Sequence, residues 1–70
     1  MRKRELLAQM AKNGDTYKSL ATALGRTYTA IWQKINGKRP FTQSEIQIII
    51  DRYNLKAKDI QEIFFASEVS

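Results

Sequence analysis

The 70-residue sequence contains no cysteine and no histidine. Without cysteine the chain forms neither a disulfide framework nor a metal site with thiolate ligands. Without histidine it lacks the side chain that most often acts as a general base or binds a metal. Glycine-rich phosphate loops and carboxylates paired in a pocket-forming pattern are missing as well. The sequence therefore predicts a protein that is not an enzyme and that holds no metal or cofactor.

Long apolar runs are also missing. No run approaches the roughly 20 residues that span a bilayer. The basic start at residues 1–4 is not followed by a signal-peptide segment, because Gln9 interrupts the apolar residues at once. We expect a cytoplasmic protein with no membrane partner and no separate domain for a small-molecule effector. A chain of 70 residues suits one small domain, 1–70, whose core is marginal without dimerisation or a ligand.

Positive charge is concentrated in the first part of the chain. Residues 1–40 contain nine Lys and Arg residues against two acidic residues, a formal net charge of +7, whereas residues 41–70 carry −2. A basic half is typical of proteins that bind phosphate polyanions, although solvated lysine-rich surfaces also occur. The distribution favours nucleic acid as the partner of the N-terminal half.

Helical periodicity dominates, and no segment alternates strictly enough to predict a strand. Apolar spacing and capping residues predict helices at about residues 3–12, 17–24, 28–35 and 57–65, and another that starts after Thr42 or Ser44 and is closed by Asn54. Asp15 and Thr16 are alternative caps for the second helix. We expect an all-α fold with five helices and a frayed tail at residues 66–70.

Residues 17–37 form the most informative segment. Two short helices there are joined by Gly25, which adopts the positive φ of a tight turn without steric cost. Ala21 is small enough for the second helix of the pair to pack closely, and Ile31 fills the space between the two helices. Alanine, glycine and a branched aliphatic residue at these intervals are typical of a helix-turn-helix.

At this point the sequence resembles a known family. Residues 16–25, Thr-Tyr-Lys-Ser-Leu-Ala-Thr-Ala-Leu-Gly, are similar to the first helix and turn of the lambda-repressor-like family, the phage Cro and CI type and its XRE-type bacterial relatives. Residues 27–38 resemble its recognition helix and the Asn-Gly-Lys loop behind it. The resemblance covers roughly residues 4–55. It implies a compact five-helix domain with the helix-turn-helix at helices 2 and 3. It also implies a transcriptional regulator or repressor that binds double-stranded operator DNA in a bacterial host cell.

The resemblance also implies roles for single residues. The third helix would enter the major groove, where the base-reading positions fall on Tyr28, Thr29 and Gln33, with Trp32 as a further candidate. The amide of Gln33 suits bidentate bonding to adenine. The phosphate-binding positions lie at the N-terminus of the second helix and in the loop after the third helix. They are Tyr17, Lys18, Asn36, Lys38 and Arg39. Residues Arg2, Lys3 and Arg4 form either an arm that reaches the duplex or a basic tail.

Three residues depart from the family's pattern. Tyr17 stands where many relatives have a glutamine, and Lys34 occupies a position that is often apolar while Ile35 is apolar instead. Trp32 shares a helix face with Tyr28, four residues earlier. The indole then either packs against the fourth helix, presses on the sugar–phosphate backbone, or marks a protein-binding face.

Apolar residues near the C-terminus exceed what one helical stripe buries. This surplus indicates a protein interface at Ile48, Ile63, Phe64 and Phe65. One interpretation is a homodimer, which matches the palindromic operators of the family. The other is that the last helix folds back and closes the core of a monomer. The surplus and the exposed aromatic residues also motivate an alternative function: an anti-repressor or modulator that keeps the helix-turn-helix but binds a phage repressor protein.

Overall fold

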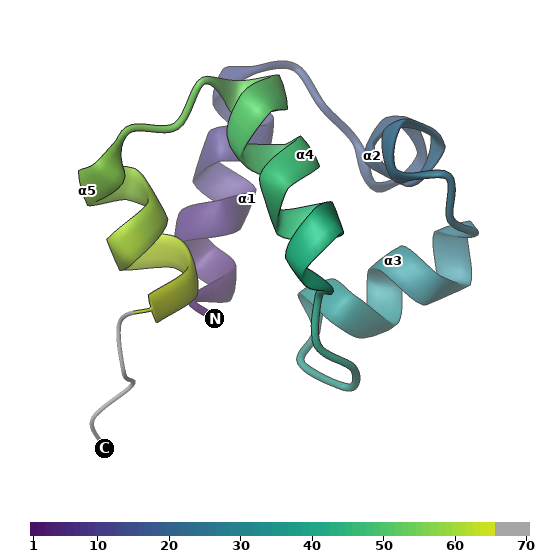
Figure 1. Cartoon of the computed structure of the whole chain (residues 1–70). Helices are drawn as coiled ribbons and strands as arrows, with labels where there is room; N and C mark the ends of the chain where they lie inside the picture. The colour runs from purple at the N-terminus through teal and green to yellow at the C-terminus, as the bar shows by residue number, and fades with distance from the viewer. Residues whose placement is uncertain (66–70) are drawn as a thin grey trace.

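The structure, a computed structural model, describes residues 1–65 and is all-helical over that range (Figure 1). The expected all-α class is thereby confirmed. The predicted tail, residues 66–70, lies outside the described residues. The elements are α1 (Lys3–Lys12), α2 (Tyr17–Leu24), α3 (Tyr28–Ile35), α4 (Gln43–Tyr53), α5 (Ala57–Ile60) and the π-helical turn η1 (Gln61–Phe65).

Threonine side chains define where three of the helices begin. The hydroxyls of Thr16, Thr27 and Thr42 each accept a hydrogen bond from the backbone N–H three residues later. At Thr16 and Thr42 the residue three positions on also accepts the cap's own N–H, which completes a capping box. Of the alternative caps considered from sequence, the structure uses Thr16 rather than Asp15, and Thr42 rather than Ser44.

Left-handed residues end two of the helices. Gly25 closes α2 with φ 66°, and Asn54 closes α4 with φ 51°, both as the sequence predicts. The last predicted helix differs, because it is α-helical only as far as Ile60 and continues as the wider turn η1. The wider turn leaves Ile63 in the core at 1% exposure and Phe65 at the surface at 59%.

The core draws apolar side chains from α1 to α4, the segment after α4 and η1. The faces of α2 and α3 that the helical spacing predicted to be apolar are all buried, including Ala21 at 4% exposure and Ile31 at 0%. These two helices pack against each other, and α2 also contacts α4. The buried apolar residues are Leu6, Met10, Leu20, Ala21, Leu24, Ile31, Ile35, Ile49, Tyr53, Leu55 and Ile63.

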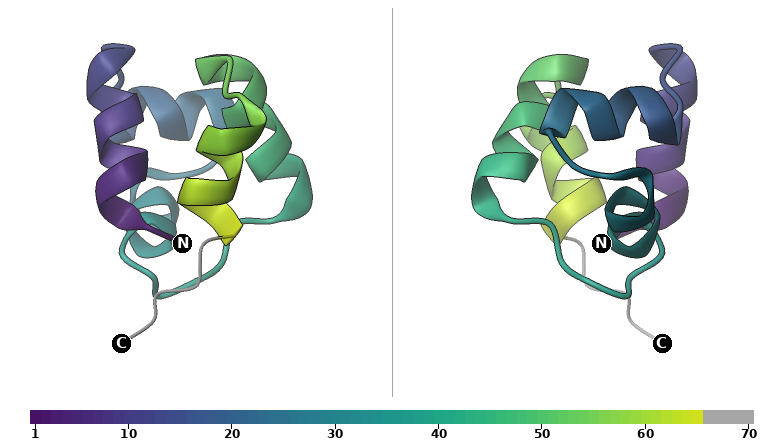
Figure 2. Two further views of the ribbon diagram at one scale, coloured as in Figure 1. Left: turned by 90° about the vertical axis from the view of Figure 1, so that its left-hand side faces the viewer. Right: turned by 90° about the vertical axis from the view of Figure 1, so that its right-hand side faces the viewer.

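The two ends of the described chain lie together. The backbone N–H of Arg2 donates to the carbonyl of Ile63 at 2.7 Å, and η1 packs against α1 (Figure 2). At the opposite side of the molecule, α2 lies above α3 in the view of Figure 1. None of the described helices has the length and apolar character needed to cross a membrane.

A carboxylate fixes the start of α2 against the end of α4. The side chain of Asp15 is only 5% exposed and accepts hydrogen bonds from Arg52 at 2.7 and 2.8 Å, from the Tyr53 hydroxyl at 2.6 Å and from the Ser19 hydroxyl at 2.5 Å. The Arg52 guanidinium holds the pKa of Asp15 far below its usual range, against the opposing effect of burial. This network holds the N-terminus of α2, where Tyr17 and Lys18 lie, in place.

Candidate nucleic-acid interface

The outer face of α3 carries all four candidate base-reading residues. Tyr28 is 56% exposed and Trp32 43% exposed, while Thr29 is exposed and Gln33 half-buried. The pairs 28/32 and 29/33 each lie one turn apart, so the four side chains form two adjacent stripes along the helix. Figure 1 shows α3 at the lower edge of the molecule, with no other described helix beneath it. Because Tyr28, Thr29 and Trp32 are exposed, this face of α3 is open to a large partner.

Trp32 belongs to this surface and not to the core. It is absent from the cluster of buried residues and from the half-buried side chains that pack against that cluster. The structure therefore disfavours the interpretation in which the indole fills space against α4. Its backbone carbonyl accepts a hydrogen bond from the Asn36 amide at 2.9 Å, which closes the C-terminal end of α3.

The N-termini of α2 and α3 meet through a pair of tyrosines. The ring centroids of Tyr17 and Tyr28 lie 6.0 Å apart with the planes tilted by 42°. Tyr17 is half-buried and packs against the core, so its ring lies between the core and the more exposed ring of Tyr28. Lys18, next in the chain, is exposed at the start of α2. The structure thus brings a candidate phosphate-binding residue into contact with a candidate base-reading residue.

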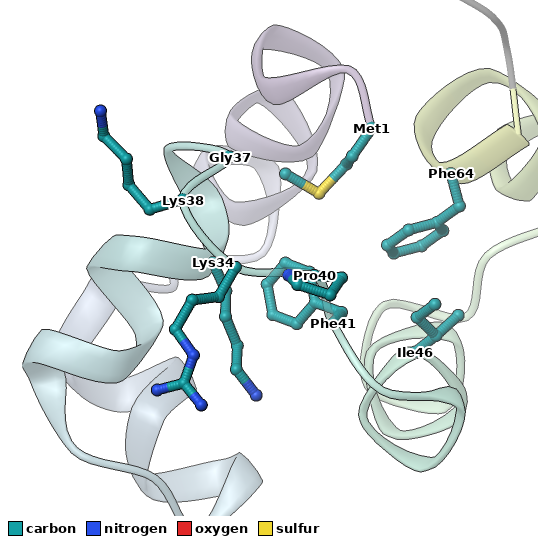
Figure 3. Close-up of a pocket in the computed structure, with 9 residues that line it drawn as sticks. Met1, Lys34, Gly37, Lys38, Pro40, Phe41, Ile46 and Phe64 are labelled. Atoms are coloured by element: carbon teal, nitrogen blue, oxygen red, sulfur yellow. The ribbon is translucent and has the colours of Figure 1, made fainter.

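The loop after α3 is held by backbone hydrogen bonds. The N–H groups of Lys38 and Arg39 both donate to the carbonyl of Gln33, at 2.8 and 3.4 Å, and Gly37 adopts φ 76° between the helix and these residues. Both cationic side chains are exposed. Figure 3 shows the side chain of Lys38 extending away from the pocket beside this loop. A fixed backbone with exposed cations suits contact with phosphates.

The basic residues at the start of the chain do not form an extended arm. Arg2 is the N-cap residue of α1, Lys3 and Arg4 lie in its first turn, and the Arg2 N–H is bonded to η1. The ammonium of Lys3 donates to the side-chain oxygen of Asn36 at 2.6 Å. The structure shows neither the arm nor the tail considered from the sequence, because helix formation and the bond to Ile63 hold these residues against the domain. The side-chain oxygen and the side-chain nitrogen of Asn36 are thus both hydrogen-bonded within the protein.

A buried ion pair links α3 to α4, and the sequence did not reveal it. The ammonium of Lys34 lies 2.6 Å from both carboxylate oxygens of Glu45, and the two side chains are 7% and 2% exposed. Glu45 also accepts the Thr42 N–H at 2.8 Å and the Nε–H of Arg26 at 2.8 Å. Lys34 and Ile35 are therefore both buried, and the charge of Lys34 is neutralised inside the protein.

Hydrogen bonding keeps this buried carboxylate ionised. Burial by itself raises the pKa of Glu45, but hydrogen bonds from Lys34 and from Thr42 outweigh it and lower the pKa from 4.5 to about 2. The only trace of this in the sequence is the spacing of Glu45 three residues after Thr42, which predicts a capping box but no partner on α3.

The predicted apolar interface is divided between core and surface. Ile63 is buried and Phe64 half-buried, whereas Ile48 is 39% exposed and Phe65 59% exposed. The prediction that Ile63 belongs to a protein interface is therefore wrong, because in this fold its side chain is buried and not available to a partner. Beside η1 lies a pocket of about 380 Å³, into which apolar side chains converge (Figure 3). Its lining includes Met1, Pro40, Phe41, Ile46 and Phe64.

Comparison of the chain with family models, with curated proteins and with solved structures finds no match.

Proposed function

We propose that the protein is a sequence-specific regulator of transcription that binds double-stranded DNA. In this proposal α2 and α3 form a helix-turn-helix of the lambda-repressor-like, Cro or CI type, and α3 lies in the major groove. The observation that carries the proposal is the open face of α3, where two stripes of base-reading side chains lie between cations at both ends. Lys18 follows Tyr17, whose ring lies 6.0 Å from that of Tyr28 at the start of α3, and Lys38 and Arg39 donate their N–H groups to Gln33 near its end.

The roles of the residues follow from their chemistry. Thr29 and Gln33 offer hydrogen-bonding groups to base edges, and the amide of Gln33 matches adenine. The N-terminal amides of α2, together with Lys18, suit one phosphate strand, and the loop cations suit the other. The ion pair between Lys34 and Glu45 holds α3 against α4 in the free protein. Less conformational entropy is then lost when α3 binds DNA.

Repression would follow from occupancy of the operator in the cytoplasm of a bacterial cell. One copy presents a single short helix to the groove, whereas a two-fold pair reads two half-sites about one helical turn apart. We propose a homodimer for this reason, with the exposed Ile48 and Phe65 and the half-buried Phe64 as candidate contacts.

A selection from randomised duplexes tests the proposal. The single tryptophan, Trp32, is exposed on the binding face and reports binding directly by fluorescence. We expect an enriched motif and submicromolar affinity that falls steeply with salt. Gln33→Ala should cost about 1–3 kcal/mol and relax the preference at one base pair, whereas Lys38→Ala should weaken all sequences equally. A purified protein that enriches no motif would refute the regulator.

The exposed aromatic residues favour a second candidate function. With 56% of Tyr28 and 43% of Trp32 exposed, the same face also suits a protein partner, since tyrosine and tryptophan are enriched in interface anchors. An anti-repressor or modulator would keep the fold and bind a phage repressor through this face. Co-purification with a repressor, in the absence of any enriched duplex, would favour this function over DNA binding.

A further inference from the structure

We propose that Tyr28 and Trp32 form a surface that reads the 5-methyl groups of thymines, so that the preferred half-site holds two thymines close together. The inference rests on the proposed function and specifies what the aromatic stripe of α3 contacts.

The stripe is aromatic and exposed, and one of its two rings is supported by a neighbouring ring before binding. The half-buried ring of Tyr17 supports the ring of Tyr28 at a centroid distance of 6.0 Å. Trp32 lies one turn further along α3, on backbone that the Asn36 amide caps. The supported ring of Tyr28 loses little conformational entropy when it is covered, which suits recognition of a shape.

Charge around the stripe points to DNA as the molecule that covers it. Residues 16–44 contain no Asp or Glu but carry five Lys and Arg residues. Of these five, only Lys34 is buried, where Glu45 neutralises it. Arg26 also binds Glu45 but is 45% exposed, and Lys18, Lys38 and Arg39 are exposed as well. Lys18 follows Tyr17, whose ring contacts Tyr28, and the N–H groups of Lys38 and Arg39 bond to Gln33 beyond Trp32, so these three cations form a frame at the two ends of the stripe. An aromatic stripe between cations matches a partner whose edges are anionic and whose centre presents apolar groups.

The major groove of DNA offers one apolar group among its base edges, the 5-methyl group of thymine. Phosphates border the groove on both sides and match the cationic frame. Residues 28 and 32 are separated by about 6 Å along the helix axis, at about 1.5 Å per residue. That separation corresponds to about two base-pair steps of about 3.4 Å, so we infer thymines within two steps of each other.

Replacement of thymine by deoxyuracil in the enriched duplex is the test. It removes the methyl group and leaves the hydrogen-bonding edge of the base unchanged. Each methyl that a ring covers should contribute about a 3- to 5-fold change in affinity. We expect this loss at two positions of the half-site, measured by titration of Trp32 fluorescence and, for Trp32 variants, by anisotropy of a labelled duplex.

Protein variants connect the methyl groups to the two rings. In Trp32→Ala and in Tyr28→Ala, the affinity ratio between the thymine and deoxyuracil duplexes should fall to about 1 at one position each. Lys58→Ala is the control, because it truncates an exposed side chain on α5 to which neither the DNA contacts nor the dimer contacts are assigned. The control should keep both ratios unchanged.

The outcomes separate this inference from the proposed function. A specific duplex that binds equally well with deoxyuracil at every position would overturn the methyl-reading surface and leave the regulator intact. The same holds if the ratios persist in both alanine variants. Failure to enrich any duplex would remove the regulator and this inference together. Loss of repressor binding in Trp32→Ala, without any thymine preference, would assign the stripe to a protein partner.

Discussion

Replacement of Glu45 by glutamine removes one negative charge from the junction between α3 and α4 and changes the shape of the side chain very little. The ammonium of Lys34 would then stay buried, at 7% exposure, without the carboxylate that now lies 2.6 Å away. Removing one partner of a buried ion pair costs about 3–5 kcal/mol, because the remaining charge is uncompensated. A domain of this size has a total free energy of unfolding of about 4–10 kcal/mol.

The lowered pKa of Glu45 points in the same direction, because it arises from the same hydrogen bonds. Its folded value of about 2 lies below the ordinary value of 4.5, so the ionised form contributes about 3 kcal/mol to stability above pH 4.5. Glutamine mimics the protonated side chain, and we therefore expect Glu45→Gln to lower the free energy of unfolding by about 3 kcal/mol. Urea unfolding followed by circular dichroism at pH 7 measures this change.

Two further variants make the measurement specific to the buried pair. Lys34→Met in the Glu45→Gln background removes both charges and should recover most of the loss, because apolar replacements of buried pairs are close to neutral. Arg26→Ala removes the partner whose side chain is 45% exposed, and it should cost less than about 1 kcal/mol. A loss below about 1 kcal/mol in Glu45→Gln, or no recovery in the double variant, would refute the reasoning.

Three other predictions concern the residues that position α2 and α3 and the proposed dimer contact. The folded-state pKa of Asp15 is lowered, so its contribution is present above the ordinary value of 3.8 and lost as the pH falls below it; Asp15→Asn should abolish its share of the acid-induced drop in melting temperature. Gly25→Ala should cost about 1 kcal/mol, because φ is 66° while no atom lies within 4 Å of the added Cβ; an unchanged melting temperature would contradict the left-handed turn. Phe65→Asp should shift sedimentation equilibrium towards monomer and weaken operator binding, and a monomeric parent protein would exclude the proposed dimer.

Local chemistry explains why so much of the fold was predictable. The starts of α2, α3 and α4 depend on a threonine and an N–H three residues away, and the end of α2 depends on the φ of Gly25. These interactions span at most one turn, so they are readable in the sequence. The exposure of Tyr28 and Trp32 also follows from helical spacing, which makes the face of α3 predictable even though its partner is not.

Long-range charge pairing was not predictable for a physical reason. Periodicity assigns a lysine to the solvent side of a helix, and only the fold brings Glu45 to Lys34, 11 residues earlier, or Arg52 to Asp15, 37 residues earlier. The wider turn of η1 was equally hidden, because the sequence of residues 57–65 suits a regular helix. Neither the arm nor the tail considered for residues 2–4 forms, because residues 3 and 4 are helical and a backbone bond to Ile63 fixes Arg2.

These pairings change how the basic character of the chain bears on DNA binding. The net charge of +7 in residues 1–40 overstates the charge that faces phosphates, because Glu45, from outside that range, neutralises Lys34 inside the protein and also binds Arg26. The three exposed cations assigned to phosphates, Lys18, Lys38 and Arg39, correspond to a salt slope of about −3 per half-site, and the two copies of a dimer double it. Electrostatics on that scale gives modest, sequence-independent affinity. A specific regulator would have to gain the rest of its affinity from two sources. One is base contacts made by the aromatic stripe, and the other is a second copy bound through the exposed Ile48 and Phe65.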